Sequence, residues 1–164
     1  MASFNLDEQS SSHVPALKLL CKLGYCYLTP QEALGLRNER QGETLLTEVL
    51  YKWLAGHNDY DYKGETYQFS TGNIQQAVNA LRQLPYDGLV TSNERAFDLI
   101  SQGKSFPQHI AGDTKSFSMR YVDWECPENN VYHVTEEFVV EKRGAMGTRR
   151  PDIVLFVNGI PFGV

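Results

Sequence analysis

Apolar residues recur at helical spacing through the first hundred residues of the chain. Val14, Leu17, Leu20 and Cys21 repeat every three or four positions, and Gly24 stands where a helix would end. Similar stripes follow, each bounded by a capping residue, a proline or a glycine. The pattern predicts helices over residues 14–23, 30–36, 43–55, from Ser70 or Thr71 to Pro85, and 94–102. Residues 59–69, which are rich in tyrosine, are expected to be irregular.

The strongest helical pattern covers residues 43–55. Its apolar stripe forms one broad face and Gly56 follows as a stop signal. The opposite face carries Glu48 and Lys52, a favourable pair four residues apart. This helix is therefore expected to pack one face on a core and to expose the other.

After Gly112 the period of the pattern changes from 3.6 to 2. Residues 116–121 and 131–141 alternate between apolar and polar side chains, with a turn predicted at residues 126–130, and residues 153–157 are continuously apolar. We therefore predict an α/β (α+β) fold, with a helical amino-terminal half followed by a mixed β-sheet flanked by helices. Residues 1–12 are expected to form a flexible arm, and residues 13–164 one domain, with helices to about 103 and the sheet from about 115.

Composition narrows the class of protein. The chain has 164 residues, a net charge of −5, 41% hydrophobic and 21% charged residues, which argues against disorder, collagen-like repeats and highly basic tails. The sequence lacks a run of roughly eighteen apolar residues and a signal-peptide pattern, so a soluble, cytoplasmic domain is expected. Three cysteines, Cys21, Cys26 and Cys126, fit neither a disulfide framework nor, with His133, a zinc-binding pattern.

The C-terminal segment contains the clearest local signal. Asn158-Gly159 between apolar runs predicts a β-hairpin in which residues 152–157 pair with the chain from Ile160 onward. In this register Asp152 faces position 165, or position 166 if a bulge forms near Pro161, which cannot donate to the ladder. Because the sequence stops at Val164 inside an apolar run, we expect a longer protein whose next strand lies beside Asp152.

Asp152 has two interpretations. It follows Pro151 and two arginines at the start of an apolar strand, so it either closes a turn and pairs with an arginine, or it binds a metal ion. Mg²⁺ takes one or two carboxylates together with substrate phosphate oxygens and several waters. A nearby lysine would then steady the attacking water and the developing negative charge during phosphodiester hydrolysis.

Several segments resemble a known family, in order along essentially the whole chain. The last is RRPDIVLFVNGIPFGV at residues 149–164, which resembles the nuclease motif of the R (restriction and motor) subunit of type I restriction endonucleases, a PD-(D/E)xK nuclease. The upstream segments are LCKLGYCYLTPQEAL (20–34), NIQQAVNAL (73–81), GDTKSFSMRYVDWECPENNVYHVTEEFVVE (112–141) and TRRPDIV (148–154). The resemblance implies a restriction-endonuclease-like fold that is incomplete at the C-terminus of this chain.

The resemblance also implies a function. Asp152 matches the first catalytic carboxylate of the family, an Mg²⁺ ligand, whereas the Glu and Lys of the motif would fall just beyond Val164. In the family, cleavage of double-stranded DNA is coupled to ATP-dependent translocation by further domains, and the R subunit works with modification and specificity subunits. This polypeptide alone is therefore expected to be inactive. The alternative is a non-catalytic DNA-binding or subunit-docking module.

Other residues carry weaker predictions. Glu48 is a candidate second metal ligand, although a solvated Glu–Lys face is the commoner explanation for such a residue. Four basic residues are candidate contacts to DNA phosphates, or else belong to a solvated loop: Lys142, Arg143, Arg149 and Arg150. The remaining residues are given structural interpretations: Glu136 and Glu137 as rim residues that lie near the site or not, His133 as packed, and Trp53, Tyr121 and Trp124 as core or sheet cover.

Overall fold

The computed structural model describes residues 13–110, 112–141 and 146–164. The fold is α+β with several small sheets, as predicted, and the chain divides into two compact units. The first unit joins the chain up to Leu46 with Val131–Val164, and the second is Thr47–Asn130. Within the described residues, no helix is long and apolar enough to cross a membrane.

The elements of each unit are as follows. The first unit contains α1 (His13–Lys22), β1 (Cys26–Leu28), α2 (Pro30–Gly35), β6 (Tyr132–Glu136), β7 (Val140–Glu141), β8 (Thr148–Arg149), β9 (Ile153–Val157) and β10 (Ile160–Gly163). The second contains α3 (Thr47–His57), β2 (Asp59–Tyr62), β3 (Glu65–Gln68), α4 (Thr71–Arg82), α5 (Leu89–Gln102), β4 (Lys104–Ile110), β5 (Asp113–Met119) and the 3-10 turn η1 (Pro127–Asn129).

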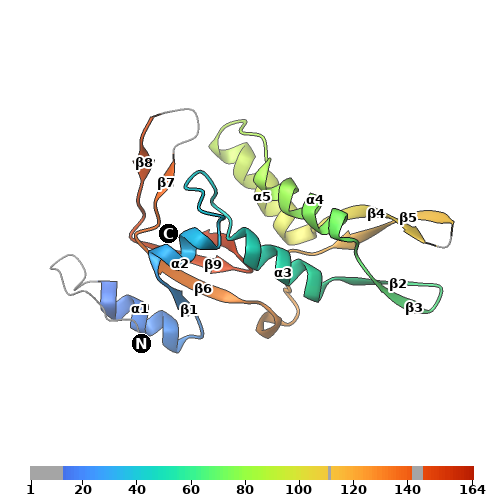
Figure 1. The fold of residues 1–164 in the computed structure, drawn as a ribbon, viewed down its shortest axis with the longest axis horizontal. Coiled ribbons are helices and arrows are strands. Elements are labelled where there is room, and N and C mark those ends of the chain that lie inside the picture. Colours follow the sequence, from blue (N-terminus) through green and yellow to red (C-terminus); the bar gives the residue numbers. More distant parts are fainter. Residues whose placement is uncertain (1–12, 111, 142–145) are drawn as a thin grey trace. The chain divides into compact units, whose positions relative to one another are not determined.

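A four-stranded sheet forms the centre of the first unit (Figure 1). Its order is β1-β6-β9-β10, in which β1 runs parallel to β6 and the other neighbours are antiparallel. Val134 of β6 lies between Tyr27 of β1 and Leu155 of β9 and is fully buried, as is Phe156. The sheet therefore joins a strand near the amino terminus to the C-terminal hairpin.

The predicted Asn158-Gly159 hairpin is confirmed. Both turn residues have positive φ, 52° and 83°, which asparagine and glycine adopt most readily. Val157 pairs with Ile160, and the register shifts between Pro161 and Gly163, so of the two registers considered the structure has the one with a bulge near the proline. On the other side of β9, the ladder with β6 runs from Val157 back to Ile153.

The Asn158 side chain is fully buried beneath this turn. Its Oδ1 accepts the Val131 N–H at 2.8 Å, and its own backbone N–H donates to the Val131 carbonyl at 2.8 Å. The Gly159 carbonyl accepts the Leu46 N–H, also at 2.8 Å. The turn thereby fixes Val131, the residue before β6, and Leu46, the last residue of the amino-terminal part of this unit.

Two helices cover the sheet, and both contact β1 and β6. Helix α2 begins as predicted, because Thr29 caps it and forms a reciprocal capping box with Glu32. Just after α2, the buried Arg37 donates to the carbonyls of Glu43 and Val139 at 3.1 and 3.0 Å and lies 4.0 Å from the centre of the Phe138 ring. These contacts anchor the chain that leaves β6.

In the second unit, α3 packs against α4. Trp53 and Tyr121 are buried there, as expected, and the Tyr121 hydroxyl donates to the Ala77 carbonyl at 2.8 Å. Asn58 joins the end of α3 to the chain after β5: its amide donates to the Arg120 carbonyl at 3.1 Å and accepts the Arg120 N–H at 2.8 Å. The core residues of this unit are Leu50, Trp53, Leu54, Phe69, Ile74, Ala77, Val78, Leu81, Phe106, Ile110, Met119, Tyr121 and Val122.

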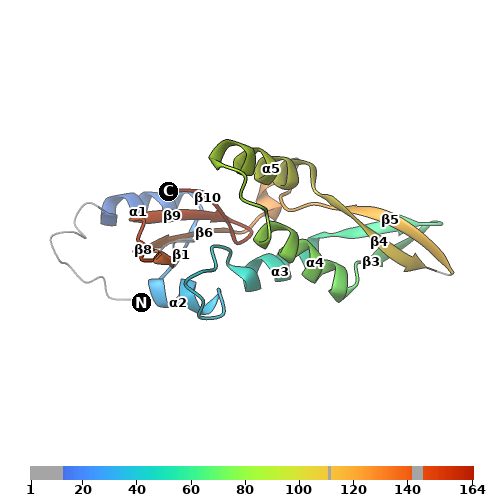
Figure 2. The same cartoon turned by 90° about the horizontal axis from the view of Figure 1, so that it is seen from above.

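Two β-hairpins extend side by side in this unit (Figure 2), β2 with β3 and β4 with β5. The Tyr60 ring stacks on Phe117 with 4.2 Å between centroids, and it meets Phe69 edge-on at 5.0 Å. An aromatic layer therefore holds the hairpins together.

A buried carboxylate organises the turn predicted at residues 126–130. Asp123 accepts hydrogen bonds from the Asn129 side-chain amide at 2.9 Å and the Cys126 N–H at 3.1 Å, and it lies 3.1 Å from Arg120 Nη2. These hydrogen bonds hold the pKa of Asp123 below its ordinary value, and the bond from Asn129 has the largest effect. Asn130, also buried, donates to the Asp123 carbonyl and accepts its N–H.

Several expectations about the elements were wrong. Strands β1, β2 and β3 lie before residue 103, where only helices were expected, and β4 was not foreseen. The 59–69 segment is a hairpin rather than irregular chain, because Asp59–Tyr62 alternates exposed acids with half-buried tyrosines. The helices expected at 43–55 and 94–102 run instead over Thr47–His57 and Leu89–Gln102.

Further corrections concern single residues. Trp124 is 55% exposed, so it is not a core residue. The strand expected over 131–141 ends at Glu136, because Glu137 takes a left-handed φ of 50° that interrupts the ladder. The flexible arm expected at residues 1–12 lies outside the described residues, and the single domain over 13–164 and the cytoplasmic location stay predictions.

The buried turn gives a test of stability. We expect Asn158→Ala to lower the free energy of unfolding by about 2–3 kcal/mol, because the Val131 N–H loses its partner and alanine tolerates positive φ poorly. Asn158→Gly keeps the turn conformation and should cost about 1–2 kcal/mol. Asn38→Ala is the control, since Asn38 has a similar φ of 55° but an exposed side chain, and should cost about 1 kcal/mol. Urea denaturation measures all three, and equal losses at Asn158 and Asn38 would contradict the buried role.

The carboxylate in the second turn makes stability depend on pH. Because the pKa of Asp123 is depressed on folding, its contribution is complete above the unfolded value of about 3.9 and is lost as pH falls through the lower folded value. The difference in unfolding free energy between the wild type and Asp123→Asn should therefore be constant above about pH 5 and shrink below about pH 4. Asn129→Ala removes the hydrogen bond that lowers the pKa of Asp123 most. In that variant, the loss of the Asp123 contribution to stability should shift to higher pH. A difference that stays constant down to about pH 2 would refute the assignment.

Candidate metal centre at the head of strand β9

Asp152 lies at the head of β9, where the ladder with β6 ends. The last ladder pair is Glu136 with Ile153. Beyond it, the Glu137 N–H donates to the Asp152 carbonyl at 3.0 Å, and the Phe138 N–H donates to the Pro151 carbonyl at 3.2 Å. The backbone of Asp152 is thus fixed by the sheet, while its side chain is exposed.

Two further carboxylates lie at the same end of the sheet. Glu136 accepts a hydrogen bond from the Tyr27 hydroxyl of β1 at 2.7 Å, in a partly buried position. Burial is the main cause that raises the pKa of Tyr27 well above its ordinary value, and the hydrogen bond to Glu136 adds to it. Tyr27 therefore stays the proton donor of the pair. Glu137 instead lies 3.5 Å from Arg150 Nη1, with both side chains about half exposed. Both glutamates therefore lie near Asp152 along the backbone, which was one of the two alternatives for them.

The predicted basic residues are only partly within the described structure. Arg149 is exposed on β8, and Arg150, also exposed, pairs with Glu137. Lys142 and Arg143 lie outside the described residues. The predicted contacts of all four with DNA phosphates stay predictions.

Glu48 belongs to the other unit. It stands in the first turn of α3 and lies 3.9 Å from Lys52, the i,i+4 pair expected from the sequence. Both side chains are largely exposed, so the pair adds at most a few tenths of a kcal/mol. A role for Glu48 beside Asp152 in a metal site stays a prediction.

The donor chemistry at the head of β9 suits Mg²⁺, although it is not a complete ligand set. Among the described residues, no group of three or more His, Cys, Asp or Glu is placed to hold a metal ion. Mg²⁺ needs only one or two carboxylates if phosphate oxygens and water supply the rest, and exposed carboxylates are donors of that kind. Asp152 is the residue here that would hold such an ion.

His133 and the three cysteines, which were considered as zinc ligands, do not form a metal-binding group among the described residues. His133 is half-buried on β6, beside Cys26 of β1 in the strand register, and burial lowers its pKa, which favours the neutral ring. The three cysteines are free and exposed.

Sequence reasoning missed the Tyr27–Glu136 pair. The two residues are 109 positions apart, and only the parallel pairing of β1 with β6 brings them together. Alternation placed Glu136 on the face that carries Tyr132 and Val134, but nothing local indicates which strand borders that face.

Comparison with known proteins identifies the family of the chain. The fold is α+β, compatible with a nuclease of the restriction-endonuclease-like class. The sequence profile of the family described as type I restriction enzyme R protein N terminus matches residues 5–164, so the chain belongs to this family. This confirms the resemblance found in the sequence, and the family is one of restriction endonuclease subunits.

A curated relative points the same way. The protein named "Putative type I restriction enzyme MjaIXP endonuclease subunit" from Methanocaldococcus jannaschii is 25% identical over 165 residues. The match covers 97% of this chain but only 15% of that relative, so this chain spans about a seventh of the relative's length.

The Tyr27–Glu136 hydrogen bond can be tested by removing the hydroxyl. We expect Tyr27→Phe to lower the free energy of unfolding by about 1–2 kcal/mol, because a partly buried charged acceptor loses its donor. Tyr67→Phe is the matched control, since the Tyr67 hydroxyl donates to Glu65 at 2.6 Å in an exposed position, and its loss should cost less than the loss at Tyr27. Guanidinium denaturation of the three proteins gives the comparison, and equal losses would show that the Tyr27 bond is no stronger than a surface contact.

Proposed function

We propose that this chain is the amino-terminal part of the nuclease region of a type I restriction R subunit. In its complete form this protein cuts double-stranded DNA with Mg²⁺. Family membership supports the class of protein, and the observation that carries the chemistry is the position of Asp152 at the head of β9 in a hairpin of the predicted register.

In this proposal Asp152 holds Mg²⁺ through its exposed carboxylate, with Glu48 as a further candidate ligand. The bound ion would polarise the scissile phosphate and lower the pKa of an attacking water. The β6–β9 ladder fixes the Asp152 backbone, which places the carboxylate at the end of the sheet.

The basic residues would hold the DNA. Arg149 and Arg150 are exposed beside the head of β9, and Lys142 and Arg143 precede them in a stretch without acids. Contacts of these residues with phosphates would position the duplex without reading its sequence. Glu137 competes with phosphate for Arg150, but an exposed pair at 3.5 Å is weak enough to exchange.

The observed bulge refines where the rest of the motif is expected. With the register shift between Pro161 and Gly163, the residue that faces Asp152 on a longer β10 is position 166. We expect the Glu-x-Lys of the family motif to begin near that position in the complete protein. ATP-dependent translocation, and assembly with modification and specificity subunits, belong to that complete protein and are part of the same proposal.

The decisive variant is Asp152→Asn in the complete R subunit, assembled with its modification and specificity subunits. DNA cleavage with Mg²⁺ and ATP should fall by roughly 100-fold or more, because the developing charge on the phosphate loses its metal. ATP hydrolysis and DNA binding should persist. Asp61→Asn, which removes an exposed carboxylate of strand β2 in the other unit, is the control and should keep cleavage within about threefold.

Wild-type cleavage by the Asp152→Asn variant would remove Asp152 from the mechanism. A complete wild-type assembly that translocates but never cuts would instead support the alternative, a non-catalytic DNA-binding or subunit-docking module.

A further inference from the structure

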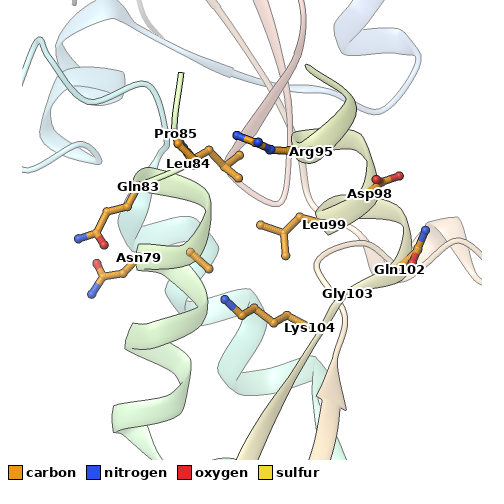
Figure 3. A pocket seen from close by; sticks show the side chains of 11 residues that line it. Asn79, Gln83, Leu84, Pro85, Arg95, Asp98, Leu99, Gln102, Gly103 and Lys104 are labelled. Atoms are coloured by element: carbon orange, nitrogen blue, oxygen red, sulfur yellow. The ribbon is translucent and has the colours of Figure 1, made fainter. Parts of the chain in front are cut away.

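The second unit contains a groove that the proposed nuclease chemistry does not use (Figure 3). It has a volume of about 570 Å³ and lies between the end of α4, the second half of α5 and the start of β4. Figure 3 shows Leu84, Arg95, Leu99 and Lys104 pointing into this space, whereas Asn79, Gln83, Asp98 and Gln102 point away from it. The groove thus combines an apolar floor with two cations.

The two cations differ in their partners. Arg95 pairs with Asp87, and the Asp87 N–H donates to the Ser92 hydroxyl at 3.1 Å, so Arg95 helps to hold the loop between α4 and α5. Among the described residues, no carboxylate lies within 4.0 Å of Lys104 Nζ. The Nζ atom lies 5.9 Å from the centre of the Phe106 ring, a cation–π contact. Lys104 is therefore the cation with capacity for an external anion.

Close backbone packing at Gly103 fixes the side of the groove that carries Lys104. The chain turns at Gly103, with φ of 73°, and a Cβ there would lie 2.4 Å from the Met119 carbonyl oxygen. Glycine is required for this close approach, and the turn places Lys104 directly after α5. The position of Lys104 is thus a consequence of backbone packing and not of a freely moving loop.

Helix α5 is less well covered than its neighbour. None of its described side chains is buried, whereas α4 buries Asn73, Ile74, Ala77, Val78 and Leu81. Leu99 is only half-buried at the groove. Since helices in proteins depend mainly on packing of an apolar face, α5 would gain stability from a ligand that covers Leu99.

We propose that this groove binds an acidic amphipathic segment of a partner protein. Its apolar side chains would cover Leu84 and Leu99, and a carboxylate would pair with Lys104. Such helix-in-groove recognition uses apolar anchors for affinity and charge for orientation. A DNA duplex is the less suitable occupant, because residues 47–130 carry 7 Lys and Arg against 11 Asp and Glu, which repels a polyanion more than a segment with one or two paired carboxylates.

Selection from a random peptide library tests this without knowing the partner. Phage displaying peptides of about 16 residues are selected on the immobilised 164-residue chain, and the recovered peptides are synthesised with a fluorophore. We expect apolar and acidic residues to be enriched, and Lys104→Gln to weaken binding by about 10-fold through loss of a charge-assisted contact. Leu99→Gln should weaken it similarly.

The matched control is Lys63→Gln, which removes another exposed cation of the same unit, one that pairs with Asp113 away from the groove. It should leave peptide affinity unchanged, and circular dichroism should show all variants folded. A peptide pool with no acidic enrichment, affinity insensitive to Lys104→Gln, or no recovered peptide would each overturn the proposal. So would a labelled DNA duplex that competes with the peptides and is itself weakened by Lys104→Gln. None of these outcomes depends on DNA cleavage, so the proposed nuclease function stands or falls separately.

Discussion

The buried Asn158 side chain is the constraint on which the first unit depends. Its Oδ1 and backbone N–H bind the two polar groups of Val131, so the turn after β9 also sets where β6 begins. A slip of one residue in this register would move every side chain of β9 to the opposite face of the sheet. It would also take Asp152 away from the end of β6. The chemistry proposed for Asp152 therefore rests on a hydrogen-bonded turn at the far end of the same strand.

Local signals explain which parts of the fold were predictable. The Asn158-Gly159 hairpin and the start of α2 at Pro30 each depend on a few neighbouring residues, and both are confirmed. The bulge near Pro161 was one of two registers considered, and the structure has it. The parallel pairing of β1 with β6 depends instead on segments more than a hundred residues apart, and three residues of β1 carry no readable period. Strand β4 was hidden because Pro107 interrupts its alternation, although its partner β5 was visible.

The candidate site shows the same division. Asp152 was predictable because the family motif is continuous in sequence, but its surroundings were not. The left-handed φ of Glu137 comes from the end of a ladder, and no residue type near it signals that conformation. The Tyr27–Glu136 bond likewise follows from the order of strands in the sheet. Sequence alone therefore identified the candidate carboxylate and missed the residues that set its electrostatic environment.

The two neighbouring glutamates differ in how firmly they are held, and this difference bears on metal binding. The Tyr27–Glu136 hydrogen bond is short and partly buried, so turning Glu136 toward an ion would leave a hydroxyl and a carboxylate poorly solvated. The Glu137–Arg150 pair is longer and about half exposed, so it contributes less than about 1 kcal/mol and exchanges easily. An ion at Asp152 would therefore draw on Glu137 before Glu136, and in doing so would release Arg150 for a phosphate. In the proposed site, the same exchange would supply both a ligand and an anion contact at the head of β9.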